Sequence, residues 1–168
     1  MPEAVSKGKA IKLGDDISTD DIIPGRFAHL RSNLPELSKH TLEDLIPNFA
    51  SKVNQGNFLV AGKNFGSGSS REHAPLVIKM SGIAAILAKS AARIFFRNAI
   101  NQGLPVLLCD TDQINDGDQL EIDLIEGVIT NLTSNARLTS IKMPPLMFAI
   151  LKEGGLIPYI KKHKDFEL

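Results

Sequence analysis

The chain has 168 residues, enough for one domain with a packed core, and 43% of them are hydrophobic. Lysine plus arginine and aspartate plus glutamate both number 19, and only 5% of residues are aromatic, so the composition offers no surface for nucleic acid or an anionic membrane. No apolar run approaches the roughly 20 residues of a membrane span, and residues 1–9 lack the apolar segment of a secretion signal, so we expect a cytoplasmic protein.

The first predicted elements are two short strands separated by a long irregular segment. Ala10–Leu13 is expected to form the first strand, and Phe58–Ala61 the second, which should be buried. A polar turn rich in aspartate, Gly14–Pro24, follows the first strand. Beyond it, Phe27–Asn57 is the least regular part of the chain, with a helical turn or two expected over Thr41–Phe49.

The best helix candidate covers Glu72–Ser81, because its apolar residues recur at helical spacing and Gly82 suits the position after a helix end. Ser69 and Glu72 stand in the Ser-x-x-Glu relation that is typical of a capping box. Ile83–Ala88 follows as a predicted buried strand.

A second helix is predicted over Ala91–Asn101, and the apolar run Leu104–Cys109 is predicted to be the next buried strand. Ser90 is expected to cap this helix, with three side chains directed inward: Ile94, Phe95 and Ile100. Cys109 is the only cysteine, and one thiol cannot form an internal disulfide or hold a zinc ion or an iron–sulfur cluster alone. We therefore expect Cys109 to be a buried small hydrophobic residue, and we expect no metal site in this chain.

The last third of the chain has a different pattern. Gln119–Ile125 and Val128–Leu132 alternate apolar and polar residues around a turn, which predicts an antiparallel hairpin. Pro145–Glu153 is the last predicted helix, and residues 162–168 are expected to be a charged C-terminal tail. The alternation of strands and helices, followed by a hairpin, predicts a single α/β domain over residues 1–168, with a mostly parallel sheet flanked by helices.

The most informative segment is the loop Gly62–His73, which contains three glycines, three serines and one arginine. The backbone N–H groups of such a loop can converge on an anion, and the helix that follows adds the positive end of its dipole. Arg71 supplies a fork that fits a carboxylate or a phosphate. This combination predicts an anion-binding site whose backbone is supplied by three residues: Gly66, Ser67 and Gly68.

The loop does not match a P-loop, a dinucleotide fingerprint or a nucleophile elbow. Backbone amides and a helix dipole stabilise an alkoxide, so Ser69 can remove a proton from a carbon next to a carboxylate that Arg71 binds. Two other interpretations stay open: Ser69 only caps the helix, or the loop binds a carboxylate or phosphate without catalysis. His73 is expected to make local hydrogen bonds rather than to act with Ser69.

Three segments together resemble the aconitase superfamily: Asp16–Arg26, Asn64–Ala74 and Ala91–Ala99. They occur in that family's order and spacing, and the resemblance covers most of residues 10–160. The match is to the swivel domain, which in the isopropylmalate dehydratase branch is a separate small subunit. The length of the chain is similar to that of such a subunit.

The resemblance implies a hydro-lyase that moves a hydroxyl group between adjacent carbons of a 2- or 3-hydroxy di- or tricarboxylic acid by dehydration and rehydration. Ser69 matches the catalytic base, and four residues match the substrate pocket: Ser70, Arg71, Thr19 and Asp20. The resemblance also implies a [4Fe-4S] cluster on a separate large subunit and none on this chain, so activity is expected only in the hetero-oligomer.

Substrate choice in this family is attributed to the residues after the Pro-Gly-Arg step, here Phe27, Ala28, His29, Leu30 and Arg31. Enzymes acting on isopropylmalate present an apolar group there and homoaconitases an arginine, and this segment departs from both patterns. Isopropylmalate, an intermediate of leucine biosynthesis, is the expected substrate, while homocitrate, dimethylmalate and methylmalate stay open.

Overall fold

One seven-stranded sheet, in the order β4-β3-β2-β1-β5-β6-β7, organises the computed structural model, which describes residues 3–164. Its strands are β1 (Val5–Lys12), β2 (Phe58–Ala61), β3 (Ala85–Ala88), β4 (Val106–Leu108), β5 (Gln119–Asp123), β6 (Val128–Asn131) and β7 (Arg137–Thr139). Neighbouring strands from β4 to β1 are parallel, and those from β1 to β7 are antiparallel. The first strand therefore belongs to both halves of the sheet.

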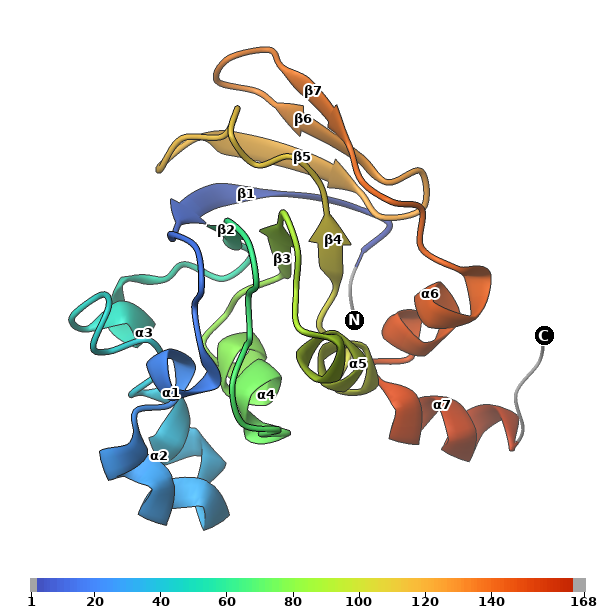
Figure 1. Cartoon of the computed structure of the whole chain (residues 1–168). Helices are drawn as coiled ribbons and strands as arrows, with labels where there is room; N and C mark the ends of the chain where they lie inside the picture. Colours follow the sequence, from blue (N-terminus) through green and yellow to red (C-terminus); the bar gives the residue numbers. More distant parts are fainter. Residues whose placement is uncertain (1–2, 165–168) are drawn as a thin grey trace.

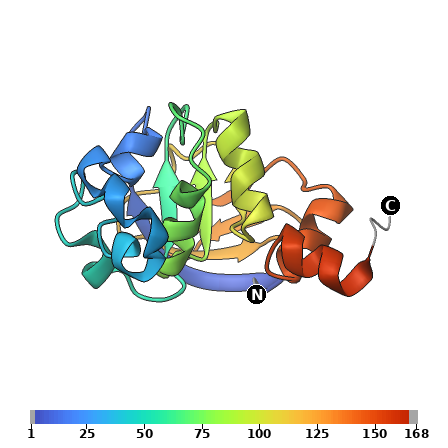
Figure 2. The same cartoon turned by 90° about the horizontal axis from the view of Figure 1, so that it is seen from below.

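The helices lie on one side of the parallel strands, as the views in Figure 1 and Figure 2 show. They are α1 (Thr19–Ile22), a 3₁₀ helix η1 (Gly25–Ser32), α2 (Leu34–Ser38), α3 (Phe49–Lys52), α4 (His73–Met80), α5 (Arg93–Asn101), α6 (Pro145–Lys152) and α7 (Leu156–His163). Within residues 3–164, none of these helices has the length and apolar character that crossing a bilayer requires.

The parallel strands are buried on both faces because the sheet curls over them (Figure 1). On β2, Leu59 and Ala61 join the core that also holds buried residues of α4 and α5. Phe58 and Val60 point the other way, into a second core shared with the antiparallel strands. Two-sided burial explains why these strands appear in the sequence as continuous apolar runs.

The predicted α/β fold is confirmed: parallel strands are flanked by helices, and an antiparallel hairpin, β5–β6, lies beside them. The helices predicted near residues 72–81 and 145–153 are also confirmed. The predicted start of the first strand at Ala10 is wrong, because β1 begins at Val5. Residues Val5–Lys9 pair with β5, whereas only Ala10–Lys12 pair with β2. Residues Val5–Lys9 include two lysines and a glycine, so this half of β1 lacks the apolar pattern from which a strand is predicted.

One further expectation about helices is wrong. Thr41–Phe49 consists mainly of turns, and the helical turns of this region lie on either side of it, in η1, α2 and α3. Helix α7 continues to His163, so it includes the first two residues of the charged tail predicted over residues 162–168. Glu153 at the end of α6 holds that last turn, with its Oε1 2.7 Å from Lys162 Nζ. Residues 165–168 of the predicted tail lie outside the described part of the chain.

Candidate functional site

Three loops of the chain meet at the carboxyl ends of β1, β2 and β3, as expected for adjacent parallel strands. The segments that leave these strands run beside one another toward the helices (Figure 1). The middle segment is the glycine–serine loop. Its Gly66 N–H donates to the Ile17 carbonyl at 2.7 Å on one side, and its Phe65 carbonyl accepts from the Ala92 N–H at 2.8 Å on the other. Both neighbours therefore fix the course of this loop.

Gly66 is the point where the loop passes closest to α5. Its φ is +76°, and a Cβ added there would lie 2.2 Å from Cγ of Phe95. Phe95 is buried and packs edge-to-face on Phe65, with ring centroids 5.1 Å apart. Only a glycine meets both the backbone and the packing requirement.

We expect Gly66→Ala to lower the free energy of unfolding by about 2–4 kcal/mol, from the strained φ and the overpacking against Phe95 together. Chemical denaturation of the isolated chain measures this loss. Gly14→Ala is the control, because a Cβ at Gly14 has nothing within 4 Å. Equal unfolding midpoints for the two variants would contradict the assigned role of Gly66.

The loop after β1 positions two predicted site residues. Ser18 starts α1 with a capping box, in which its Oγ accepts from the Asp21 N–H at 3.1 Å and its N–H donates to Asp21 Oδ2 at 2.7 Å. The buried Thr19 then donates from Oγ1 to the Ser69 carbonyl at 3.0 Å. Asp20 extends to Arg71, and its Oδ1 lies 2.6 Å from Arg71 Nη2. The first and second sequence motifs are thus joined directly.

The serine loop leaves its polar groups free around Ser69. Within residues 3–164, the side-chain hydroxyls of Ser69 and Ser70 make no hydrogen bond, and none of the backbone N–H groups of residues 68–72 donates one. Both serines are exposed. This set of unused donors beside a hydroxyl is the arrangement that stabilises an anion.

The capping box predicted between Ser69 and Glu72 is wrong. Helix α4 has Glu72 itself as its N-cap residue, without a side-chain cap hydrogen bond. The cap predicted at Ser90 is also wrong, because α5 starts after Ala92 and Ser90 Oγ instead accepts from the Asn64 N–H at 2.8 Å. Ser90 therefore helps to hold the serine loop rather than the helix.

A cleft of about 360 Å³ opens where this loop faces α5. Its lining comes from the loop, from α1 and from the start of α5: Thr19, Gly66, Gly68, Ser69, Arg71, Ala92, Arg93, Ile94, Phe95, Arg97 and Asn98. Asp20 reaches the site through its ion pair with Arg71. Among the described residues, the backbone of Ser67, the side chain of Ser70 and the segment Phe27–Arg31 do not line the cleft.

Helix α5 contributes residues that the sequence reasoning missed. Arg93, Arg97 and Asn98 line the cleft, as does the buried Phe95, whereas the buried Ile100 does not. Ile94 was expected to point inward, but it is 51% exposed and lines the cleft. The helix starts at Arg93 rather than Ala91, and Phe95 and Ala99 at i, i+4 spacing set its buried face.

Comparison with known proteins gives consistent matches. The model of the aconitase C-terminal domain matches residues 15–111. The 3-isopropylmalate dehydratase small subunit 2 of Archaeoglobus fulgidus is 58% identical, over 96% of this chain and 98% of that protein. Small subunit 1 of Thermotoga maritima is 56% identical, over 95% and 97%. This chain belongs to the 3-isopropylmalate dehydratase small subunits of the aconitase family.

A solved structure of the family has the same fold. The crystal structure of 3-isopropylmalate dehydratase from Methanocaldococcus jannaschii superposes with a TM-score of 0.89 at 47% identity, and 95% of each chain is covered. The resemblance carried by the three sequence motifs is therefore confirmed, and so is the α/β fold class.

The residues of this family member do not fit an iron–sulfur cluster. Cys109 is buried, and burial raises the pKa of its thiol to about 11. Clusters are held by several thiolates, which a single buried thiol cannot replace. Among the described residues, no group of three or more His, Cys, Asp or Glu side chains is arranged to hold a metal ion.

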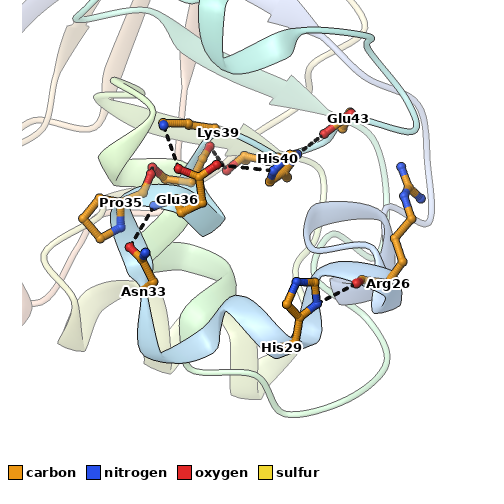
Figure 3. Close-up of polar contacts among 10 residues, drawn as sticks. Arg26, His29, Asn33, Pro35, Glu36, Lys39, His40 and Glu43 are labelled. Carbon is orange, nitrogen blue, oxygen red and sulfur yellow. Dashed lines mark hydrogen bonds and ion pairs between the residues drawn. The ribbon is translucent and has the colours of Figure 1, made fainter.

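The segment to which substrate choice is attributed in this family is held by its own contacts. The Phe27 ring stacks on His40 with centroids 3.8 Å apart, and the Arg26 guanidinium lies 4.5 Å from the same ring. Figure 3 shows His40 between Glu36 and Glu43. The Oε2 atom of Glu43 is 2.5 Å from His40 Nδ1. These contacts anchor the segment on α2 and the turn after it. The role of residues 27–31 in specificity stays a prediction.

Proposed function

We propose that this chain is the small subunit of a 3-isopropylmalate dehydratase, a hydro-lyase that moves a hydroxyl group between adjacent carbons by dehydration and rehydration. The observation that carries the proposal is the free hydroxyl of Ser69, which stands in a cleft beside unused backbone N–H groups and Arg71. The names of the relatives, which match over nearly their full length, support 3-isopropylmalate as the substrate.

In the proposed reaction, Ser69 is the base. Its alkoxide oxygen takes the proton from the carbon next to a carboxylate, and the electron pair of that C–H bond forms the double bond. The adjacent C–O bond breaks, and its electrons leave with hydroxide, which takes up a proton from solvent to become water. The free N–H groups of residues 68–72 stabilise the negative charge on Ser69 before the transfer. Arg71 binds the carboxylate through guanidinium donors that its bonds to Asp20 and to the Ile23 carbonyl leave unused. Rehydration reverses these steps with the hydroxyl on the other carbon.

The site is completed by a partner in this proposal. We place the [4Fe-4S] cluster implied by the resemblance on a separate large subunit, because this chain supplies one buried cysteine. The open, exposed side of Ser69 and Ser70 is then the side that faces the large subunit.

The proposal predicts activity only in the assembled enzyme. The chain is mixed anaerobically with the large subunit, and conversion of 3-isopropylmalate is followed for the mixture and for each subunit alone. We expect turnover in the mixture and none in either subunit. Homocitrate and dimethylmalate are run in parallel, and preferred turnover of either would replace the proposed substrate. Tight binding of the diacid by the isolated chain, with no turnover in the mixture, would favour a simple binding module.

A further inference from the structure

The cleft contains positive charge that the chain does not neutralise. Arg71 is compensated, because its Nη2 lies 2.6 Å from Asp20 Oδ1 and its Nη1 donates to the Ile23 carbonyl at 3.1 Å. Arg93 and Arg97 line the same cleft, yet neither side chain forms an ion pair or hydrogen bond with residues 3–164. Both are exposed. The positive charge of the cleft that no described acidic residue neutralises therefore lies on α5, at Arg93 and Arg97.

The placement of these two arginines is unfavourable for the helix on its own. They stand at i, i+4, where like charges repel, and the first turn of α5 contains no acidic residue. The buried face of α5 does not need them, since Phe95, Ala99 and Ile100 supply its packing. Two repelling cations that point into a cleft are expected where an anion relieves the repulsion.

We propose that Arg93 and Arg97 bind the second carboxylate of the substrate, opposite the carboxylate held at Arg71, and so select diacids over monoacids. This inference rests on the proposed function. A cleft of about 360 Å³ lies within the range of small-ligand sites, and it reaches from the serine loop to α5. A diacid that spans it has one carboxylate at each wall, with the carbon that loses its proton near Ser69.

The test uses the assembled enzyme and unreactive inhibitors. Isopropylsuccinate, which lacks the hydroxyl group, is compared with its two monoamides, in which one carboxylate is replaced by a neutral amide. For the wild type we expect the diacid to inhibit more strongly than either monoamide. In Arg93→Gln/Arg97→Gln, the inhibition constant of the diacid and the KM of the substrate should rise about 10- to 100-fold. The constant of the monoamide that lacks the distal carboxylate should stay unchanged.

Arg137→Gln is the matched control, because Arg137 is an exposed arginine on β7 without an ion pair in the described residues, and it lies outside the cleft. It should alter none of these constants. Association with the large subunit is measured by sedimentation for each variant. A double variant that keeps the full preference for the diacid overturns the inference, as does one that loses only subunit association. If the wild-type mixture turns over no hydroxy acid, the proposed function itself has failed.

Discussion

Replacing Ser69 by alanine is expected to reduce the turnover of the assembled enzyme by about 10³-fold or more, the scale of losing a principal catalytic group. The change removes the only atom assigned to proton transfer. It leaves the loop intact, because the Ser69 carbonyl, not its hydroxyl, accepts the hydrogen bond from Thr19. Steady-state kinetics measures the loss of turnover, and sedimentation of the complex measures subunit assembly separately. We expect unchanged assembly.

Ser70→Ala provides the comparison for this prediction, since Ser70 is the adjacent exposed serine with an equally free hydroxyl. If Ser70 contacts the substrate in the assembled enzyme, as the resemblance implies, Ser70→Ala should mainly raise KM and retain most of the turnover. Near-normal turnover in Ser69→Ala would remove Ser69 from the role of base. It would favour the interpretation of the loop as an anion-binding element without catalysis.

Arg71→Lys is expected to raise the KM of the assembled enzyme by about 10- to 100-fold with a smaller effect on turnover. The guanidinium of Arg71 already holds Asp20 and the Ile23 carbonyl and still has donors for a carboxylate. A lysine ammonium is a single point that cannot bond all three partners in this geometry. Calorimetric titration of the complex with isopropylsuccinate measures the lost affinity.

Asp20→Asn tests whether the ion pair of Arg71 with Asp20 contributes to the binding of the carboxylate by Arg71. It removes the 2.6 Å ion pair but keeps the guanidinium. If Asp20 positions the guanidinium, this variant should also weaken binding, although less than Arg71→Lys. Arg137→Lys serves as the control for the arginine-to-lysine change on an exposed surface. Unaltered affinity in Arg71→Lys would contradict its assignment to the carboxylate.

The serine loop can be located from the sequence because the residue types alone indicate its chemistry. Glycines allow an unusual backbone conformation, serines supply hydroxyl groups, and an arginine can bind an anion. The sequence also predicts the parallel sheet, since strands buried on both faces leave continuous apolar runs. The ion pair between Asp20 and Arg71 was not predictable in the same way. It joins positions far apart in the chain, and it forms because β1 and β2 lie side by side.

The errors at helix starts have one physical cause. Ser69 and Ser90 both occupy positions that suit a cap, but tertiary contacts use them otherwise: the Ser69 carbonyl bonds Thr19, and the Ser90 hydroxyl bonds the Asn64 N–H. On α5, the sequence prediction also directs Ile94 inward, whereas Ile94 lines the cleft together with Arg93 and Arg97. The spacing of Arg93 and Arg97 at i, i+4, on either side of the apolar Phe95, was the sequence pattern that could have indicated a positively charged helix face.

The division of β1 between two partners has a consequence for how the molecule unfolds. Its first half pairs with the antiparallel strands and its second half with the parallel ones, so a single stretch of backbone joins the two parts of the sheet. Neither part can separate without breaking pairing in this common strand. We therefore expect the two parts of the sheet to unfold together in one cooperative transition.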